Sequence, residues 1–159
     1  MKIVLGNDQG GYDLKEKLKN HLFLPKTKKE LKITAVYDYG CLCPDPVDYP
    51  DFAEPVARQI SKGFADLGIL ICGSGIGMSI AANKLPGIRA AVCENPVSAR
   101  LAREHNDANI LCLGARFVAP EYAKEIVTAF LKAKFSNEER HKRRIKKISQ
   151  LEKSARKKK

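Results

Sequence analysis

The sequence contains no run of eighteen or more apolar residues and therefore predicts no membrane-spanning segment. Its N-terminus starts directly with the strand-like residues MKIVLG and shows no signal-peptide pattern. Cysteine is sparse, with five residues scattered along the chain, and the odd number argues against a disulfide framework. Together these absences favour a cytoplasmic protein with no membrane partner.

Metal-binding patterns are also scarce. Cys41 and Cys43 form a CxC pair, but no second pair of ligands accompanies it. Because a structural zinc site needs more ligands than this, a pair of loop thiols is the simpler interpretation, and we predict no metal ion.

Positive charge is concentrated at the C-terminus. The 159-residue chain has a formal net charge of +11, from 29 Lys and Arg against 18 Asp and Glu. Residues 140–159 contain eleven of these basic side chains and a single acidic one, Glu152, so they account for +10. A nearly neutral body, which the length favours as one domain, thus carries a very basic C-terminal helix and tail.

The chain is organised around residues 65–84, ADLGILICGSGIGMSIAANK. The apolar run 68–71 has no polar alternation, which is typical of a strand buried on both faces of a parallel sheet. A glycine-rich turn, 72–77, follows it, and a helical pattern starts at Met78. This order of elements places backbone N–H groups around an anionic ligand.

The other segments repeat the alternation of strand and helix. Strands are expected at 1–6, 33–37, 88–93 and 108–113, and helices at 12–24, 51–62, 96–104 and 120–133, with a last basic helix from about 137. Pro25 and the lysines after it are expected to form a linker, and residues 40–50 an irregular, proline-rich loop. The pattern predicts an α/β fold, a Rossmann-like, doubly wound sheet of five parallel strands.

Three turns are expected to meet at one edge of this sheet. Ligands of open parallel sheets bind at the carboxyl ends of the strands, where the turns at Asp8, Cys72 and Arg116 lie. Cys72 is either a small buried side chain or a thiolate, favoured by nearby N–H dipoles, that acts as base or nucleophile. For Cys93 and Cys112, inside apolar strands, we prefer the first interpretation.

Several other polar residues leave two interpretations open. His105 is either a functional group or part of a solvated helix end, and Asp8 either a functional carboxylate or a cap of its turn. His21 is expected to be only a helix-face residue. Four arginines can either bind a phosphate through forked contacts or form a solvated basic surface: Arg116, Arg140, Arg143 and Arg144.

Five segments, which cover nearly all of residues 1–148, resemble the type B ribose-5-phosphate isomerases, a family that also contains galactose-6-phosphate isomerase subunits. These segments are GNDQGGYDLKEKLK, VDYPDFAEPVA, GILICGSGIGMSIAANKLPGIRAA, SARLAREHNDANILCLGAR and RHKRRIKKI. The resemblance implies a cytoplasmic aldose–ketose isomerase without metal or organic cofactor. It also implies a homodimer with shared active sites, or a tetramer.

The resemblance also implies roles for individual residues. Cys72 matches the cysteine that moves a proton between the first two carbons of the substrate, and His105 the residue that opens the sugar ring. Asp8 matches a contact to sugar hydroxyls and Tyr49 a residue lining the ring. Ser74 and the backbone of Gly73, Gly75, Ile76 and Gly77 match the anion hole for the enediolate. Arg116, Arg140 and Arg144 match phosphate ligands, and we also expect Asn106, beside His105, and Gln9 to bind the substrate.

The chain departs from the family pattern at three places. Gln9 stands where histidine is usual, and an amide cannot carry a proton. The linker 25–31 is longer than usual, and the lysine-rich end is not part of the pattern. We therefore divide the chain into an isomerase domain, 1–148, and a basic tail, 149–159.

The expected reaction is the interconversion of ribose 5-phosphate and ribulose 5-phosphate through an enediolate. Isomerisation of allose or galactose 6-phosphate is the alternative within the same class. A nucleic-acid-binding protein on a retired isomerase body is the alternative from another class, because clustered lysines bind phosphate backbones. It is disfavoured because no aromatic platform accompanies the lysines and the predicted catalytic residues are intact.

Overall fold

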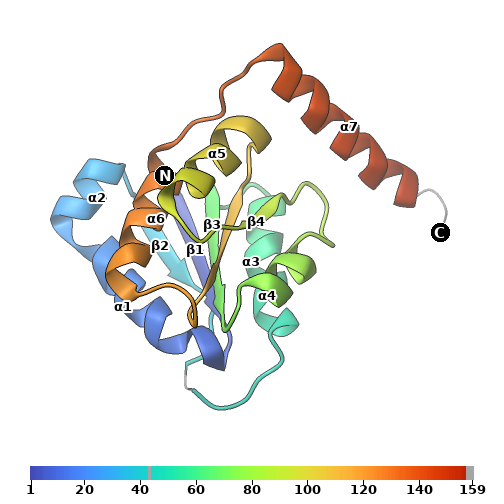
Figure 1. The fold of residues 1–159 in the computed structure, drawn as a ribbon. Coiled ribbons are helices and arrows are strands. Elements are labelled where there is room, and N and C mark those ends of the chain that lie inside the picture. The colour runs from blue at the N-terminus through green and yellow to red at the C-terminus, as the bar shows by residue number, and fades with distance from the viewer. Residues whose placement is uncertain (43, 157–159) are drawn as a thin grey trace.

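The computed structural model describes residues 1–42 and 44–156. Its centre is a sheet of five parallel strands in the order β2-β1-β3-β5-β4 (Figure 1). The strands are β1 (Lys2–Asn7), β2 (Ala35–Asp38), β3 (Leu67–Cys72), β4 (Ala90–Val92) and β5 (Ile110–Gly114). This confirms the predicted doubly wound α/β fold.

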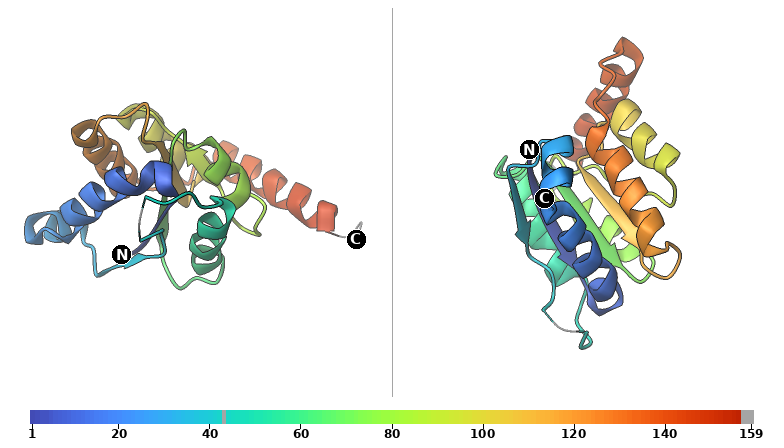
Figure 2. Two further views of the ribbon diagram at one scale, coloured as in Figure 1. Left: turned by 90° about the horizontal axis from the view of Figure 1, so that it is seen from below. Right: turned by 90° about the vertical axis from the view of Figure 1, so that its left-hand side faces the viewer.

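Helices cover both faces of the sheet (Figures 1 and 2). One face packs against α1 (Tyr12–Phe23), α2 (Pro25–Leu31), α5 (Pro96–Asn106) and α6 (Pro120–Lys132). The other packs against α3 (Pro50–Ser61) and α4 (Ile76–Ala82). The sheet is therefore buried on both sides, which is why β3 shows no polar alternation.

Side chains of β3 alternate between the two cores. Ile69 and Ile71 belong to the core beside α1, α5 and α6, whereas Leu70 and Cys72 belong to the core beside α3 and α4. The register pairs Cys72 with Gly114 of β5, and Ile71 with Asn7 of β1. Because all strands run in one direction, the ends of β1, β3 and β5 lie at the same edge, which we call the carboxyl edge.

Two sequence predictions need correction. The lysine-rich residues predicted as a linker form helix α2, because Pro25 is tolerated at a helix start and Thr27 and Leu31, four residues apart, are both buried. Helix α5 runs to Asn106 rather than 104, so His105 lies within its last turn.

The basic C-terminal residues form helix α7 (Glu139–Arg156), which contacts α5 and then extends beyond the sheet (Figures 1 and 2). It begins two residues later than predicted, after Asn137 with a positive φ of 58°. The helix passes residue 148 without a break, so the domain boundary there remains a prediction. Residues 157–159 of the predicted tail lie outside the described residues.

Candidate active site

The turn after β3 is folded around the side chain of Cys72. The backbone N–H of Gly75 donates a hydrogen bond to Cys72 Sγ (3.0 Å), and that of Ile76 donates to Ser74 Oγ (3.3 Å). Gly75 has a φ of 77°, and a Cβ there would lie 3.0 Å from the carbonyl carbon of Leu113. Glycine is thus required at this position, and its N–H is directed at the sulfur of Cys72.

The turn after β1 lies directly against this one. Asp8 caps the 3-10 turn η1 (Gln9–Gly11), with Oδ1 accepting from the N–H of Gly11 at 3.1 Å. A Cβ on Gly10 would lie 2.9 Å from the nitrogen of Gly73. Burial raises the pKa of Asp8, while backbone N–H groups and, more weakly, Arg116 act in the opposite direction.

The turn after β5 completes the group. The N–H of Arg116 donates to the carbonyl of Gly73 (3.1 Å). A Cβ on Gly73 would lie 3.1 Å from Arg116 Nε, so the guanidinium lies along the glycine-rich turn. The three turns therefore meet at the carboxyl edge, as the sequence predicted.

Two more predicted residues lie at the same edge. The ring of Tyr49 covers Gly77, since a Cβ on this glycine would be 2.8 Å from Tyr49 Cζ. Gln9 accepts a hydrogen bond from the backbone N–H of Val47 (3.1 Å) through Oε1. Both contacts attach the proline-rich loop, 40–50, to the turns.

The end of α5 and the start of α7 lie at the opposite edge, where the strands begin (Figure 1). His105 is in the last turn of α5, just before β5, and its ring centroid is 4.4 Å from that of His141 in α7. The five residues of β5, at about 3.3 Å each, separate the two edges by roughly 15 Å. A single chain therefore does not bring His105 to Cys72.

The arginines of α7 belong to this second group. Arg140 and Arg144 are one helical turn apart, and Arg140 Nε donates to Glu138 (2.7 Å). Burial lowers the pKa of His141; Glu138 opposes this shift, and the positive charges of Arg140 and Arg144 add to it. Asn106 lies beside His105 with its side chain exposed, and its carbonyl accepts from Arg89 Nε at 3.0 Å.

Comparison with known proteins identifies the family of the chain. A family described as Ribose/Galactose Isomerase matches residues 3–148. The chain belongs to this family. It is 44% identical to ribose-5-phosphate isomerase B of Escherichia coli, over 95% of this chain and 96% of that protein. It is also 44% identical to D-erythrulose-4-phosphate isomerase of Pectobacterium atrosepticum, over 85% of each chain.

A solved structure supports the fold of this isomerase as well. Ribose-5-phosphate isomerase B of Clostridium thermocellum superposes with a TM-score of 0.90 at 49% sequence identity, covering 98% of this chain and 99% of that one. The chain is therefore an enzyme of the isomerase class.

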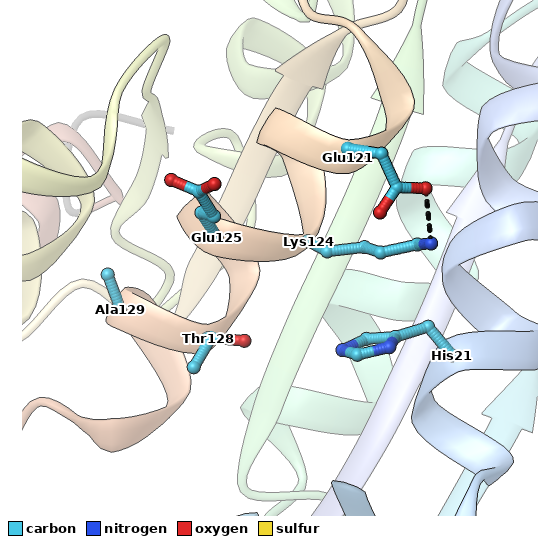
Figure 3. Close-up of a pocket in the computed structure, with 6 residues that line it drawn as sticks. All are labelled: His21, Glu121, Lys124, Glu125, Thr128 and Ala129. Carbon is cyan, nitrogen blue, oxygen red and sulfur yellow. Dashed lines mark hydrogen bonds and ion pairs between the residues drawn. The ribbon is translucent and has the colours of Figure 1, made fainter.

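Two cavities lie beside Gln9 at the carboxyl edge. One of about 370 Å³ is lined by Gln9 and residues 46–48, and one of about 220 Å³ by Gln9, Gly10, Lys17 and neighbours. A third, of about 480 Å³, lies between α1 and α6 (Figure 3) and contains none of the predicted site residues. His21 lines this third cavity beside the Glu121–Lys124 ion pair, which agrees with its prediction as a helix-face residue.

Sequence reasoning missed Lys15 and His141. The side chain of Lys15 is completely buried and bonds to Asp38 Oδ2 (2.9 Å), at the end of β2. Its position beside the apolar stripe of α1 was a signal, since it adjoins Leu14 and precedes Leu18 by three residues. His141 had no comparable signal, because its contact with His105 joins residues from two helices.

The surroundings of Cys93 and Cys112 agree with a packing role. Cys93 and Cys112 are buried, and burial raises the pKa of both thiols. Cys41 is also buried, whereas Cys43 lies outside the described residues. Within residues 1–42 and 44–156, no cluster of His, Cys, Asp or Glu could hold a metal ion, and no helix is long and apolar enough to cross a membrane.

Proposed function

We propose that this sugar phosphate isomerase interconverts ribose 5-phosphate and ribulose 5-phosphate, at active sites that each combine residues of two chains. The observation that carries the proposal is the meeting of Cys72, Asp8 and Arg116 at one edge, while His105 and two arginines gather at the other. Neither group alone supplies both ring opening and proton transfer.

The chemical step needs one base between two carbons. The Cys72 thiolate takes the proton from C2 of the open-chain aldose, and the C–H electron pair forms the C1–C2 double bond of an enediolate. The sulfur returns that proton to C1 while a second proton passes from O2 to O1, which produces the ketose. Backbone N–H groups of the turn stabilise the charge that develops on oxygen in between.

Residues at the carboxyl edge of one chain and at the opposite edge of the other chain share the binding of the substrate. Asp8 and Tyr49 contact the sugar at the carboxyl edge, and Ser74 with the glycine turn surrounds the enediolate. His105 opens the ring, with Asn106 beside it, because an imidazole has one ring nitrogen that can donate a proton and one that can accept it. The guanidinium groups of Arg116, Arg140 and Arg144 bind the phosphate, for which their forked geometry is suited.

A homodimer explains the exposed apolar residues. Ile148 of α7 is 47% exposed, and Ile76 and Ile80 of α4 are 54% and 56% exposed. A second copy packed against these helices would cover the exposed apolar side chains and bring its own His105, Arg140 and Arg144 to the Cys72 turn. The enzyme would then have two equivalent sites.

A tetrose or hexose phosphate is the competing substrate. The chain is 44% identical to D-erythrulose-4-phosphate isomerase over 85% of its length, and 44% identical to ribose-5-phosphate isomerase B of Escherichia coli over 95% of its length. The deciding experiment offers the purified protein tetrose, pentose and hexose phosphates and follows each product directly. A kcat/KM for ribose 5-phosphate below that of another sugar would reject our choice of substrate.

The shared site has its own test. Cys72→Ala and His105→Asn chains with different tags are co-expressed, and the mixed dimer is purified. If sites are shared, one site of this dimer has both defects and the other has neither, so about half of the wild-type activity returns. No recovery would show that each site lies within one chain.

A further inference from the structure

The loop between β2 and α3 is firmly anchored at both ends. At its start, Tyr39 N–H donates to the carbonyl of Leu5 (2.8 Å), and Cys41 N–H donates to the carbonyl of Asn7 (3.2 Å). The buried Lys15–Asp38 ion pair supports the same end. At its other end, the ring of Tyr49 lies on Gly77, next to the glycine-rich turn.

The middle of the loop has a single attachment. Among residues 42 and 44–48, the hydrogen bond from Val47 N–H to Gln9 Oε1 (3.1 Å) is the only one to another element, apart from the Asp48–Asp51 bond that starts α3. Pro44 and Pro46 have no N–H to donate, and both restrict the backbone around Val47. The side chain of Gln9 therefore holds residues 44–48, whose backbone the two prolines restrict.

This attachment lies beside two cavities. The two cavities at the carboxyl edge, of about 370 and 220 Å³, share Gln9 as a lining residue. Val47 is two residues before Tyr49, whose ring covers Gly77, so this hydrogen bond lies close to the glycine-rich turn. The Gln9 amide is suited to this contact, because its oxygen accepts a hydrogen bond without adding negative charge near a phosphate.

We propose that Gln9 is a positioning residue: its hydrogen bond to Val47, which we call the latch, holds residues 44–49 in place and thereby sets substrate affinity in this isomerase. The kinetic part of this inference rests on the proposed function, whereas the latch itself does not. Loss of the latch loosens the loop without touching the Cys72 turn, so KM rises and kcat changes little.

The test compares Gln9→Met, which keeps the length but removes the acceptor, with Gln9→Glu, which keeps an acceptor oxygen. Hydrogen exchange of the Val47 amide is followed by NMR, and KM and kcat are measured for ribose 5-phosphate. In Gln9→Met we expect exchange and KM each to rise about two- to tenfold, the factor set by one hydrogen bond. In Gln9→Glu the exchange rate returns to that of the wild type.

Three results overturn the proposal. Unchanged Val47 exchange in Gln9→Met, with a higher KM, would mean that Gln9 contacts the substrate directly. Faster exchange with an unchanged KM would mean that the loop does not control affinity. Fast exchange in Gln9→Glu would show that the acceptor is not what holds Val47. If the wild type isomerises no sugar phosphate, the proposed function fails, while the exchange measurement still decides whether the latch exists.

Discussion

Replacement of Cys72 separates the chemistry of this site from its folding. Its side chain is 5% exposed, and Sγ accepts the Gly75 N–H at 3.0 Å. Cys72→Ser keeps an acceptor for that N–H, whereas Cys72→Ala leaves a buried donor without a partner. Both replacements remove the thiolate that we assign as the base.

The expected loss of turnover and the expected loss of stability differ in size. Loss of a positioned acid–base group lowers kcat by a factor on the order of 100 or more. The unpaired Gly75 N–H costs about 1–3 kcal/mol of folding free energy in Cys72→Ala, and much less in Cys72→Ser. Since domains unfold with about 5–15 kcal/mol, both variants stay folded.

The assay is the formation of ketose from ribose 5-phosphate, with the melting temperature measured by circular dichroism. Cys93→Ala is the matched control, because this thiol is also buried but lies outside the three turns. It should lose about 1 kcal/mol of stability through lost packing and keep full turnover. A Cys72→Ala enzyme within a few-fold of wild-type kcat would refute the assignment of the base.

Three further predictions concern other parts of the molecule. Because burial raises the pKa of Asp8, the folded state gains stability as pH falls through that pKa and loses stability as pH rises. Asp8→Asn keeps the cap of the turn but cannot titrate, so urea unfolding measured from pH 3 to 7 should show a flatter pH dependence of stability. The same variant should have a lower kcat. Arg144→Ala should raise KM at least tenfold, or about 1.4 kcal/mol in binding, with a small change in kcat; a flat KM would show that α7 is only a basic surface. Truncation after Ile148 removes the hydrogen bond from Gly87 N–H to Glu152 (3.0 Å), so we expect a melting temperature a few degrees lower. Turnover should be unchanged, and a loss of turnover would place the tail in the active site.

The sequence alone was sufficient for the architecture. Apolar runs such as 68–71, separated by helical patterns, predict parallel strands buried on both faces, because burial pattern is a local property of each segment. The same reasoning predicted the meeting of the Asp8, Cys72 and Arg116 turns, since the ends of parallel strands share an edge. It failed for α2, where a proline and lysines suggested a linker but two buried residues one turn apart stabilise a helix.

The tertiary structure decided how the predicted site residues are divided. In the sequence, Cys72 and His105 are both placed near strand ends, yet a helix that precedes a strand ends at the opposite edge from a turn that follows one. The contacts of Gln9 with Val47 and of His105 with His141 join residues 38 and 36 positions apart, so no local pattern could reveal them. Residue types and spacing determine which groups are available for chemistry, whereas packing between distant segments determines which of them meet.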